Sequence, residues 1–421
     1  MRDLERDILE EVERRRDEII GFLRELVKRP SLTGNEKEIQ EFIAGQLEKM
    51  DLQIDMWDLD VDELKKHPDY EPRHIDYKDR PNLVGRYKGK GGGKSLIFNG
   101  HVDVCSPGPR EAWKFDPFSA MIHEGKMYGR GASDMKSGLA AMTMALKILL
   151  DKGIEPKGDV ILEYVIGEEN TSNGTLATVL RGYRADAAIN AEASDLEVQP
   201  AVSGSMWFEI TVRGRSASMS RIWEAVSPIE QGYKIFEAIK DLYEIRVSEK
   251  RHPLYPDPRG ALGLFVGVFE SGEFPSVPPE ICRIKGRMGI LPNEKVEEAQ
   301  KEFIDFILER AKLDPWLRMH PPEVRFAGYL GAPAQIDPSH PFCITVADCF
   351  KEATGREALV KGHEGASDMR VLVSAGIPTV VFGPGTITQM HAVNEWVELK
   401  DLIEATKVMA LVITRWCGCQ A

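Results

Sequence analysis

The sequence predicts an α/β protein whose main domain has a mainly parallel sheet flanked by helices, interrupted by a smaller inserted α+β domain. Up to about residue 200, short apolar runs typical of buried strands alternate with segments that repeat apolar residues every three or four positions, as helices do. The pattern changes at about Ser203 and returns after Pro321. We therefore predict a discontinuous main domain of residues 1–200 and 320–421 and an inserted domain of residues 201–319.

The first part of the main domain begins with two predicted helices. Their apolar faces consist of Ile19, Phe22, Leu23 and Leu26, and of Ile39, Phe42, Ile43 and Leu47. Residues 82–99 then predict a strand, a glycine-rich hairpin and a second strand. The turn ends in Gly93-Lys-Ser, like a phosphate-binding loop, but Lys88 stands where that motif needs glycine and a strand follows, so we interpret it as a hairpin loop.

The remaining elements follow from the same patterns. Residues 139–150 predict a nearly all-apolar helix, and residues 159–167 and 185–189 predict strands. In the inserted domain we expect a strand at 207–213 and helices at 228–243 and 296–311. The main domain then resumes with a helix at 342–353, a strand at 379–382 and a final helix at 399–414.

Composition restricts the possible partners and location. Hydrophobic residues make up 43% and charged residues 29% of the 421, as in globular proteins, and the net charge of −13 disfavours nucleic acid and anionic membranes. The N-terminus has no apolar core of a secretory signal and the six cysteines are sparse, so we expect a cytoplasmic protein. We interpret Cys417-Gly-Cys419 as a frayed tail.

Five short segments place metal-ligand residue types near the ends of predicted strands or at a helix entrance. They contain His101 and Asp103, Asp134, Glu168 and Glu169, Glu192, and His391. Ligand sites of open α/β sheets lie at the carboxyl ends of the strands. Adjacent carboxylates such as Glu168 and Glu169 repel each other unless cations neutralise them. Singly, each segment also fits an ordinary salt bridge, helix cap or solvated loop.

Together, in this order, the segments resemble the metallopeptidase M20 family, which includes acetylornithine deacetylase, succinyl-diaminopimelate desuccinylase, aminoacylase and glutamate carboxypeptidase. The family pattern runs H-x-D, G-R-G-x-x-D-x-K, E-E, a single acid and a late H. It matches His101/Asp103, Asp134/Lys136, Glu168/Glu169, Glu192 and His391 over nearly the whole chain.

The resemblance implies two metal ions bridged by Asp134. One would also be bound by His101 and Glu192, the other by Glu169 and His391. Glu168 would be the general base, with Asp103 supporting the site beside His101. Zinc is the first expectation, with cobalt or manganese as alternatives. The resemblance further implies that Arg370, in Gly365-Ala-Ser-Asp368-Met-Arg370, binds a substrate carboxylate, and that the peptide after Asp134 is cis.

The inserted domain departs from the family pattern at two expected substrate-binding positions. Ser218 stands where relatives carry a histidine that reaches across a dimer to the developing oxyanion, and Ser276 stands where asparagine is common. His252 and His363 lie near these segments in the sequence and are candidates to replace the missing histidine, but we interpret both as ordinary surface histidines. An oxyanion donor is worth about 3 kcal/mol, so another group supplies it or the substrate differs from an acyl amino acid.

We therefore expect a metal-dependent hydrolase that cleaves an amide C–N bond of a small substrate through a metal-bound water, as an N-acyl amino acid deacylase or dipeptidase. A hydrolytic deaminase or another atypical C–N hydrolase, and a non-catalytic metal-binding protein, are the alternatives. The expected partners are a small molecule bearing a carboxylate and a second copy bound through the inserted domain, which would act as a lid. No nucleic acid or membrane partner is expected.

Overall fold

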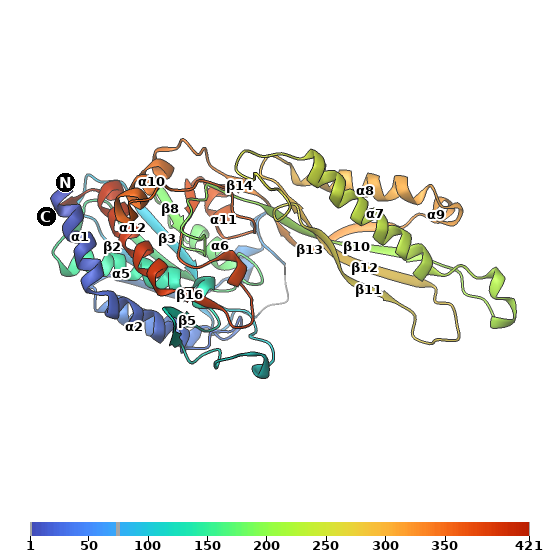
Figure 1. Cartoon of the computed structure of the whole chain (residues 1–421), viewed down its shortest axis with the longest axis horizontal. Coiled ribbons are helices and arrows are strands. Elements are labelled where there is room, and N and C mark those ends of the chain that lie inside the picture. Colours follow the sequence, from blue (N-terminus) through green and yellow to red (C-terminus); the bar gives the residue numbers. More distant parts are fainter. Residues whose placement is uncertain (1, 73–75, 421) are drawn as a thin grey trace. The chain divides into compact units, whose positions relative to one another are not determined.

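The computed structural model describes residues 2–72 and 76–420 (Figure 1). Contacts divide the chain into two compact units. Unit 1 comprises the residues up to Ala201, Gln335–Lys361 and the residues from Ser367 on, and unit 2 comprises Val202–Ala334 and Gly362–Ala366. Each unit has its own hydrophobic core. Among the described residues, no helix combines the length and apolar character needed to cross a membrane.

Unit 1 is built on a six-stranded sheet with the order β1-β2-β7-β3-β8-β15. These strands are β1 (Gln53–Asp58), β2 (Pro81–Tyr87), β3 (Leu96–His101), β7 (Val160–Val165), β8 (Ala187–Asn190) and β15 (Thr379–Val381). The pairs β7/β3, β3/β8 and β8/β15 are parallel, and β1/β2 and β2/β7 are antiparallel. Every residue of β3, β7 and β8 is buried, as expected for parallel strands covered on both faces. The predicted α/β fold class is confirmed.

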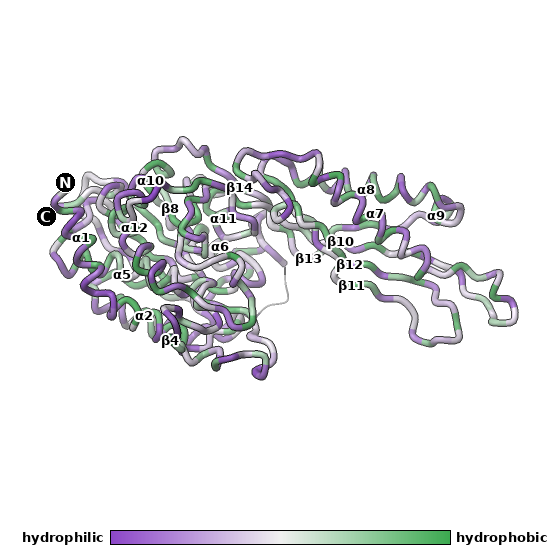
Figure 2. The backbone as a smooth tube through the Cα atoms, in the orientation of Figure 1, coloured by the Kyte–Doolittle hydropathy of each residue, from purple (hydrophilic) through white to green (hydrophobic). Residues whose placement is uncertain are grey.

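Helices cover both faces of this sheet. They are α1 (Arg2–Arg14), α2 (Arg16–Val27), α3 (Lys37–Glu48), α4 (Val61–Leu64), α5 (Ser137–Asp151), α6 (Asn173–Leu180), α10 (Pro341–Thr354), α11 (Met369–Ser374) and α12 (Leu399–Cys417). The connections β3-α5-β7 and β7-α6-β8 run in opposite directions along the sheet, so right-handed crossovers place α5 and α6 on opposite faces. The outer helix α1 is largely hydrophilic in Figure 2, but its Ile8 and Val12 are buried.

Short elements complete unit 1. They are β4 (Met121–His123), β5 (Lys126–Tyr128), β6 (Glu155–Pro156), β16 (Trp396–Glu398), β17 (Cys419–Gln420), and the helical turns η1 (Arg110–Ala112), η2 (Ala132–Lys136) and η4 (Ile387–Gln389). Two-residue strands β9 (Ala201–Val202) and β14 (Ala334–Gln335) lie where the chain passes between the units.

The expected hairpin at residues 82–99 is wrong. Strands β2 and β3 do not pair with each other, because β7 lies between them and pairs with both. Their glycine-rich connection instead packs on the segment that enters β7. A Cβ added to Gly93 would lie 1.9 Å from the Cys417 carbonyl oxygen and 2.5 Å from the Gly158 nitrogen, so this close approach of backbones requires glycine.

The interpretation of Cys417-Gly-Cys419 as a frayed tail is also wrong. Cys417 is buried at the end of α12, and β17 pairs antiparallel with β6. The chain end is therefore held by backbone hydrogen bonds to a segment more than 250 residues earlier in the sequence.

Unit 2 is an antiparallel sheet with the order β11-β12-β10-β13, covered by two helices. Its elements are β10 (Gly204–Arg213), η3 (Met219–Glu224), α7 (Pro228–Glu249), β11 (Leu264–Ser271), β12 (Ile281–Ile290), α8 (Val296–Ala311), α9 (Pro315–Met319) and β13 (Glu323–Gly331). The expected boundary at residue 320 falls before β13, but β13 pairs with β10 and so belongs to unit 2. Phe208 of β10 packs against Phe303 of α8 with tilted rings whose centroids lie 4.6 Å apart, which joins sheet and helix in the core.

Candidate active site

Three neighbouring strands deliver most of the predicted site residues to one edge of the unit 1 sheet. His101 ends β3, Glu168 and Glu169 follow β7, and Glu192 follows β8. Because β7, β3 and β8 are parallel neighbours, their carboxyl ends meet at this edge. The turn η2 brings Asp134 and the loop before β16 brings His391 to the same place.

A first group of ligand-type atoms is formed by His101, Asp134 and Glu192, all buried. His101 Nε2 lies 3.1 Å from Asp134 Oδ1 and 3.2 Å from Glu192 Oε1. Its other ring nitrogen, Nδ1, lies 2.9 Å from the carbonyl oxygen of Asp103, which orients the ring. Glu192 Oε2 is buried and has no hydrogen-bond partner among the described residues. A buried acceptor of this kind is expected to contact a cation or a hydrogen-bond donor.

A second group faces the other oxygen of Asp134. His391 Nε2 lies 3.3 Å from Asp134 Oδ2 and 2.7 Å from Glu169 Oε2. Asp134 therefore presents one oxygen to each histidine. The backbone of His391 has a φ of 59°, a left-handed conformation that is uncommon outside glycine and often marks functional sites. The Asp134–Met135 peptide is cis, as expected.

Cys105, which the predicted site does not include, joins the second group. A ligand atom from each of Cys105, Glu169 and His391 lies within 4.8 Å of the other two. The Cys105 backbone nitrogen also donates to Glu169 Oε1 at 3.0 Å. Burial and the charge of Glu169 raise the pKa of the thiol to about 12, so the thiol is protonated while no cation is bound.

The electrostatics show crowding of negative charge. Burial raises the pKa of Glu168 well above its ordinary value and that of Glu192 to about 7. Burial lowers the pKa of His101, but Glu192 and Asp134 outweigh this effect and raise it well above its usual range. Hydrogen bonds to Asp134 and Glu169 raise the pKa of His391 to about 10. The two imidazoles and the carboxylates crowded around them therefore shift one another's pKa values.

Asp103 holds the turn that carries the paired glutamates. Its carboxylate accepts hydrogen bonds from the backbone nitrogens of Glu168 at 3.2 Å and Glu169 at 3.3 Å, and from Thr33 Oγ1 at 2.8 Å. Glu168 Oε2 lies 3.9 Å from His101 Nε2. Asp103 therefore orients both glutamates, and Glu168 lies at the edge of the first group.

A buried ion pair that the sequence interpretation missed fixes the turn of Asp134. Glu395 is fully buried and pairs with Arg130 at 2.6 Å. It also accepts from the backbone nitrogens of Gly131, Ser133 and Asp134 at 3.0, 2.8 and 3.0 Å. Arg130 Nη2 donates to the His391 carbonyl oxygen at 3.2 Å, which ties the turn to the histidine loop. The only indication of this ion pair in the sequence was that Arg130 lies in the segment of Asp134 and Glu395 in the segment of His391.

Arg370, at the start of α11, is buried rather than exposed. Its guanidinium pairs with the buried carboxylate of Glu71. Asp368 is itself buried and accepts from Thr175 Oγ1 at 2.6 Å. Carboxylate recognition by Arg370 stays a prediction, in which a substrate would have to compete with Glu71.

The other predicted binding residues lie in unit 2. Ser218 and Ser276 are exposed, and the Oγ atoms of Ser218 and Ser220 lie 3.0 Å apart. The interpretation of His252 and His363 as surface histidines is wrong, because both are buried. The His252 ring packs on Tyr255, whose hydroxyl donates to the His363 carbonyl oxygen at 2.9 Å.

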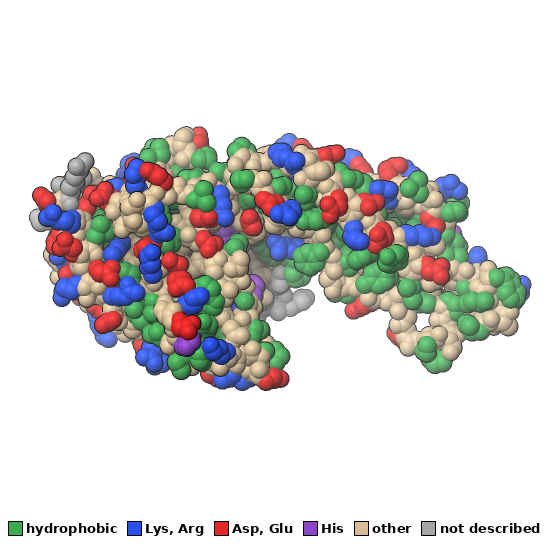
Figure 3. Space-filling model, in the orientation of Figure 1, with side chains coloured by type: hydrophobic (Ala, Val, Ile, Leu, Met, Phe, Trp, Pro, Cys, Tyr) green, Lys and Arg blue, Asp and Glu red, His purple; other side chains and the backbone are tan. Residues whose placement is uncertain are grey.

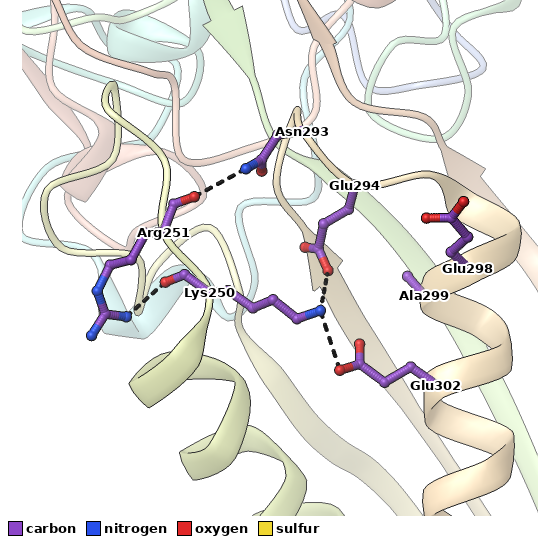
Figure 4. Close-up of a pocket in the computed structure, with 7 residues that line it drawn as sticks. All are labelled: Lys250, Arg251, Asn293, Glu294, Glu298, Ala299 and Glu302. Atoms are coloured by element: carbon purple, nitrogen blue, oxygen red, sulfur yellow. Dashed lines mark hydrogen bonds and ion pairs between the residues drawn. The ribbon is translucent and has the colours of Figure 1, made fainter.

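Unit 2 also contains a pocket of about 500 Å³ lined mainly by charged side chains of the segment after α7, the turn before α8 and α8 itself (Figure 4). Lys250 Nζ lies 3.3 Å from Glu294 and 3.2 Å from Glu302, and Glu298 pairs with Lys295 at 2.8 Å. Because its carboxylates are paired with lysines of the same unit, this pocket lacks the crowded acids that distinguish the unit 1 site.

Comparisons with known proteins find relatives that match nearly the whole chain. The family model described as peptidase family M20/M25/M40 matches residues 97–415. The N-formyl-4-amino-5-aminomethyl-2-methylpyrimidine deformylase of Halalkalibacterium halodurans is 30% identical, covering 98% of this chain and 97% of its own.

Solved structures show the same fold. A tripeptidase from Staphylococcus aureus superposes with a TM-score of 0.73 at 20% identity, covering 95% of this chain and 99% of its own. A dinuclear metal binding peptidase of the M20 family from Bacillus subtilis superposes with a TM-score of 0.66 at 17% identity, covering 96% of this chain and 99% of its own. With the family model matching well over half of its residues and a relative similar over nearly its full length, the chain belongs to peptidase family M20/M25/M40.

Proposed function

We propose that this protein is a co-catalytic di-metal hydrolase that cleaves the amide C–N bond of a small N-acyl substrate. The observation that carries the proposal is the arrangement of two histidine and carboxylate groups around the two oxygens of Asp134. His101 and Glu192 would complete one cation position, and Glu169 and His391 the other. The dinuclear metal binding relative from Bacillus subtilis supports this assignment.

The residues fit two divalent cations. The buried, unpartnered Glu192 Oε2 and the crowded carboxylates of Asp134, Glu168 and Glu169 need positive charge nearby. Imidazole and carboxylate donors suit zinc, cobalt and manganese. We put zinc first, because it is accommodated by mixed nitrogen and oxygen donors at low coordination number.

The proposed chemistry assigns a separate task to each side chain. Two bound dications would lower the pKa of a water molecule and polarise the amide carbonyl. Glu168, which is not needed as a ligand, takes a proton from the attacking water and returns it to the leaving nitrogen. Asp103 holds Glu168 through its backbone nitrogen, so the carboxylate keeps its position during both transfers.

For the substrate, we propose an N-acyl amine with a ring or charge of its own rather than an ordinary acyl amino acid. The deformylase relative, whose name specifies an N-formyl aminomethylpyrimidine, supports this choice. So does Ser218, which lacks the charge and reach of the histidine expected at that position. A formyl group is small, so its removal makes few demands on an acyl pocket.

The test is hydrolysis by metal-stripped and zinc-reloaded protein. We expect the reloaded protein to release formate from an N-formyl aminomethylpyrimidine faster than it releases acetate or succinate from acylated amino acids. Two equivalents of zinc should restore full activity. The proposal is wrong if the reloaded protein hydrolyses none of the formyl, acetyl, succinyl or dipeptide substrates faster than its Glu168→Gln variant does.

We also propose that unit 2 pairs with a second copy of the chain. Hydrophobic side chains gather at the end of unit 2 that carries η3 and the loop after β11 (Figure 3). Met219 and Phe274 there are 58% and 65% exposed and line a cleft of about 570 Å³. Such a patch is costly to leave in water. Sedimentation should show a dimer that Phe274→Asp weakens, and a monomeric wild type at micromolar concentration would contradict this.

A further inference from the structure

Cys105 lies beside the second cation position, although neither the predicted ligand set nor the family pattern includes a thiol there. The three ligand atoms of Cys105, Glu169 and His391 lie within 4.8 Å of one another. The hydrogen bond from the Cys105 backbone nitrogen to Glu169 Oε1, at 3.0 Å, joins the cysteine backbone to the carboxylate itself. The thiol is half-buried and free of any disulfide.

These separations are close to those of donors that share one metal ion. Zinc–sulfur bonds are about 2.3 Å and zinc–nitrogen or zinc–oxygen bonds about 2.0 to 2.2 Å, so two donors on one zinc lie about 3.5 Å apart at tetrahedral angles. His391 Nε2 and Glu169 Oε2 are in direct contact at 2.7 Å, so they would separate by less than about 1 Å to share an ion. The Cys105 sulfur lies at most 4.8 Å from the other two ligand atoms, so it would have to move about 1 Å closer to share an ion with them. Rotation about the Cα–Cβ bond of Cys105 can provide this movement.

We propose that Cys105 Sγ binds the cation held by Glu169 and His391, so that this position selects thiophilic metals such as Zn²⁺, Co²⁺ or Cd²⁺ over Mn²⁺. The inference rests on the proposed function, because it concerns the second of the two cation positions. On binding, the thiol releases one proton to solvent and the thiolate sulfur forms a bond to the metal. No oxidant or reductant takes part.

The two cation positions then differ in kind. The position of His101, Asp134 and Glu192 has only nitrogen and oxygen donors, which accept manganese as well as zinc. The position of Cys105, Glu169 and His391 adds a soft donor, which disfavours manganese. Mixed loading is therefore the expected outcome when both metals are offered, with zinc at the cysteine side.

The experiment is cobalt spectroscopy and metal titration of the metal-stripped full-length protein. With two equivalents of Co²⁺, the wild type should show a sulfur-to-cobalt charge-transfer band in the near ultraviolet that accounts for one of the two ions. Cys105→Ser should lose this band and bind one of two Zn²⁺ ions at least about tenfold more weakly, since even substitutions outside the ligand set cost that much. Its affinity for Mn²⁺ should not fall.

Cys419→Ser is the matched control, because Cys419 is also a half-buried free thiol but lies in β17. It should keep the band and both affinities. If Cys105→Ser does not fold, Cys105→Ala takes its place in the same measurements. The charge-transfer band of the wild type tests the inference without any variant. If wild-type protein binds two Co²⁺ ions without the band, or if Cys105→Ser keeps the band and the zinc preference, the thiolate inference is wrong and the proposed function survives. If wild-type protein binds no Co²⁺, both are wrong.

Discussion

Replacing Glu395 by Gln should destabilise the protein and disturb the turn that carries Asp134. Oε2 of Glu395 accepts from Arg130 at 2.6 Å and Gly131 at 3.0 Å, and Oε1 accepts from Ser133 at 2.8 Å and Asp134 at 3.0 Å. A glutamine amide has one oxygen, so in either orientation two buried donors lose their acceptor. At about 1 to 3 kcal/mol for each such donor, we expect a loss of about 2 to 6 kcal/mol.

The upper end of this range applies when Arg130 is one of the two donors, because its charge is then buried without its partner. The assay is thermal unfolding together with zinc affinity measured by competition with a chelator. A lower melting temperature should accompany weaker zinc binding, because the same carboxylate holds the backbone of Asp134.

Glu398→Gln provides the matched control three residues away. Glu398 forms a partly exposed pair with Lys126 at 3.3 Å, which should be worth less than about 1 kcal/mol. If Glu395→Gln and Glu398→Gln unfold at the same temperature and bind zinc equally, the structural argument for Glu395 as the residue that positions Asp134 is refuted.

Three further predictions concern other residues. Glu168→Gln should keep both metal ions and lose most turnover, whereas Glu169→Gln should also lose metal; near-normal kcat in Glu168→Gln would place the base elsewhere. Burial raises the pKa of Glu163 from 4.5 to about 7, so its stabilising contribution is complete below pH 4.5 and is lost as the pH rises through 7. At pH 8 the free energy of unfolding of Glu163→Gln should therefore exceed that of wild type by about 3 kcal/mol, with a higher melting temperature, and the difference should close near pH 4.5. A difference independent of pH would contradict this. Ser218→His should either raise activity on N-acetyl amino acids or obstruct the native substrate, and unchanged kcat/KM on both would show that Ser218 is silent.

Local patterns in the sequence determined much of this protein. The helix expected at residues 296–311 has the same bounds as α8. Its repeat of apolar residues is a local pattern, so it could be recognised without the rest of the chain. Pro228 likewise begins α7, since proline suits the first helical turn. The order of the segments that contain His101, Asp134, Glu169, Glu192 and His391 pointed to one site through its resemblance to the M20 pattern. The gathering of strand ends in this class of fold supports that resemblance for His101, Glu169 and Glu192.

Tertiary structure alone decided what depends on distant partners. Strand β7 enters between β2 and β3, so a hairpin that looked complete in the local sequence does not form. The chain end pairs with β6, and Arg130 pairs with Glu395, which lies 265 residues later in the sequence. Cys105 reaches the second cation position only because β3 and β7 are neighbours. In each case the stabilising energy comes from pairing and burial between segments far apart in the chain. The local repeat of apolar residues gives no information on such distant partners.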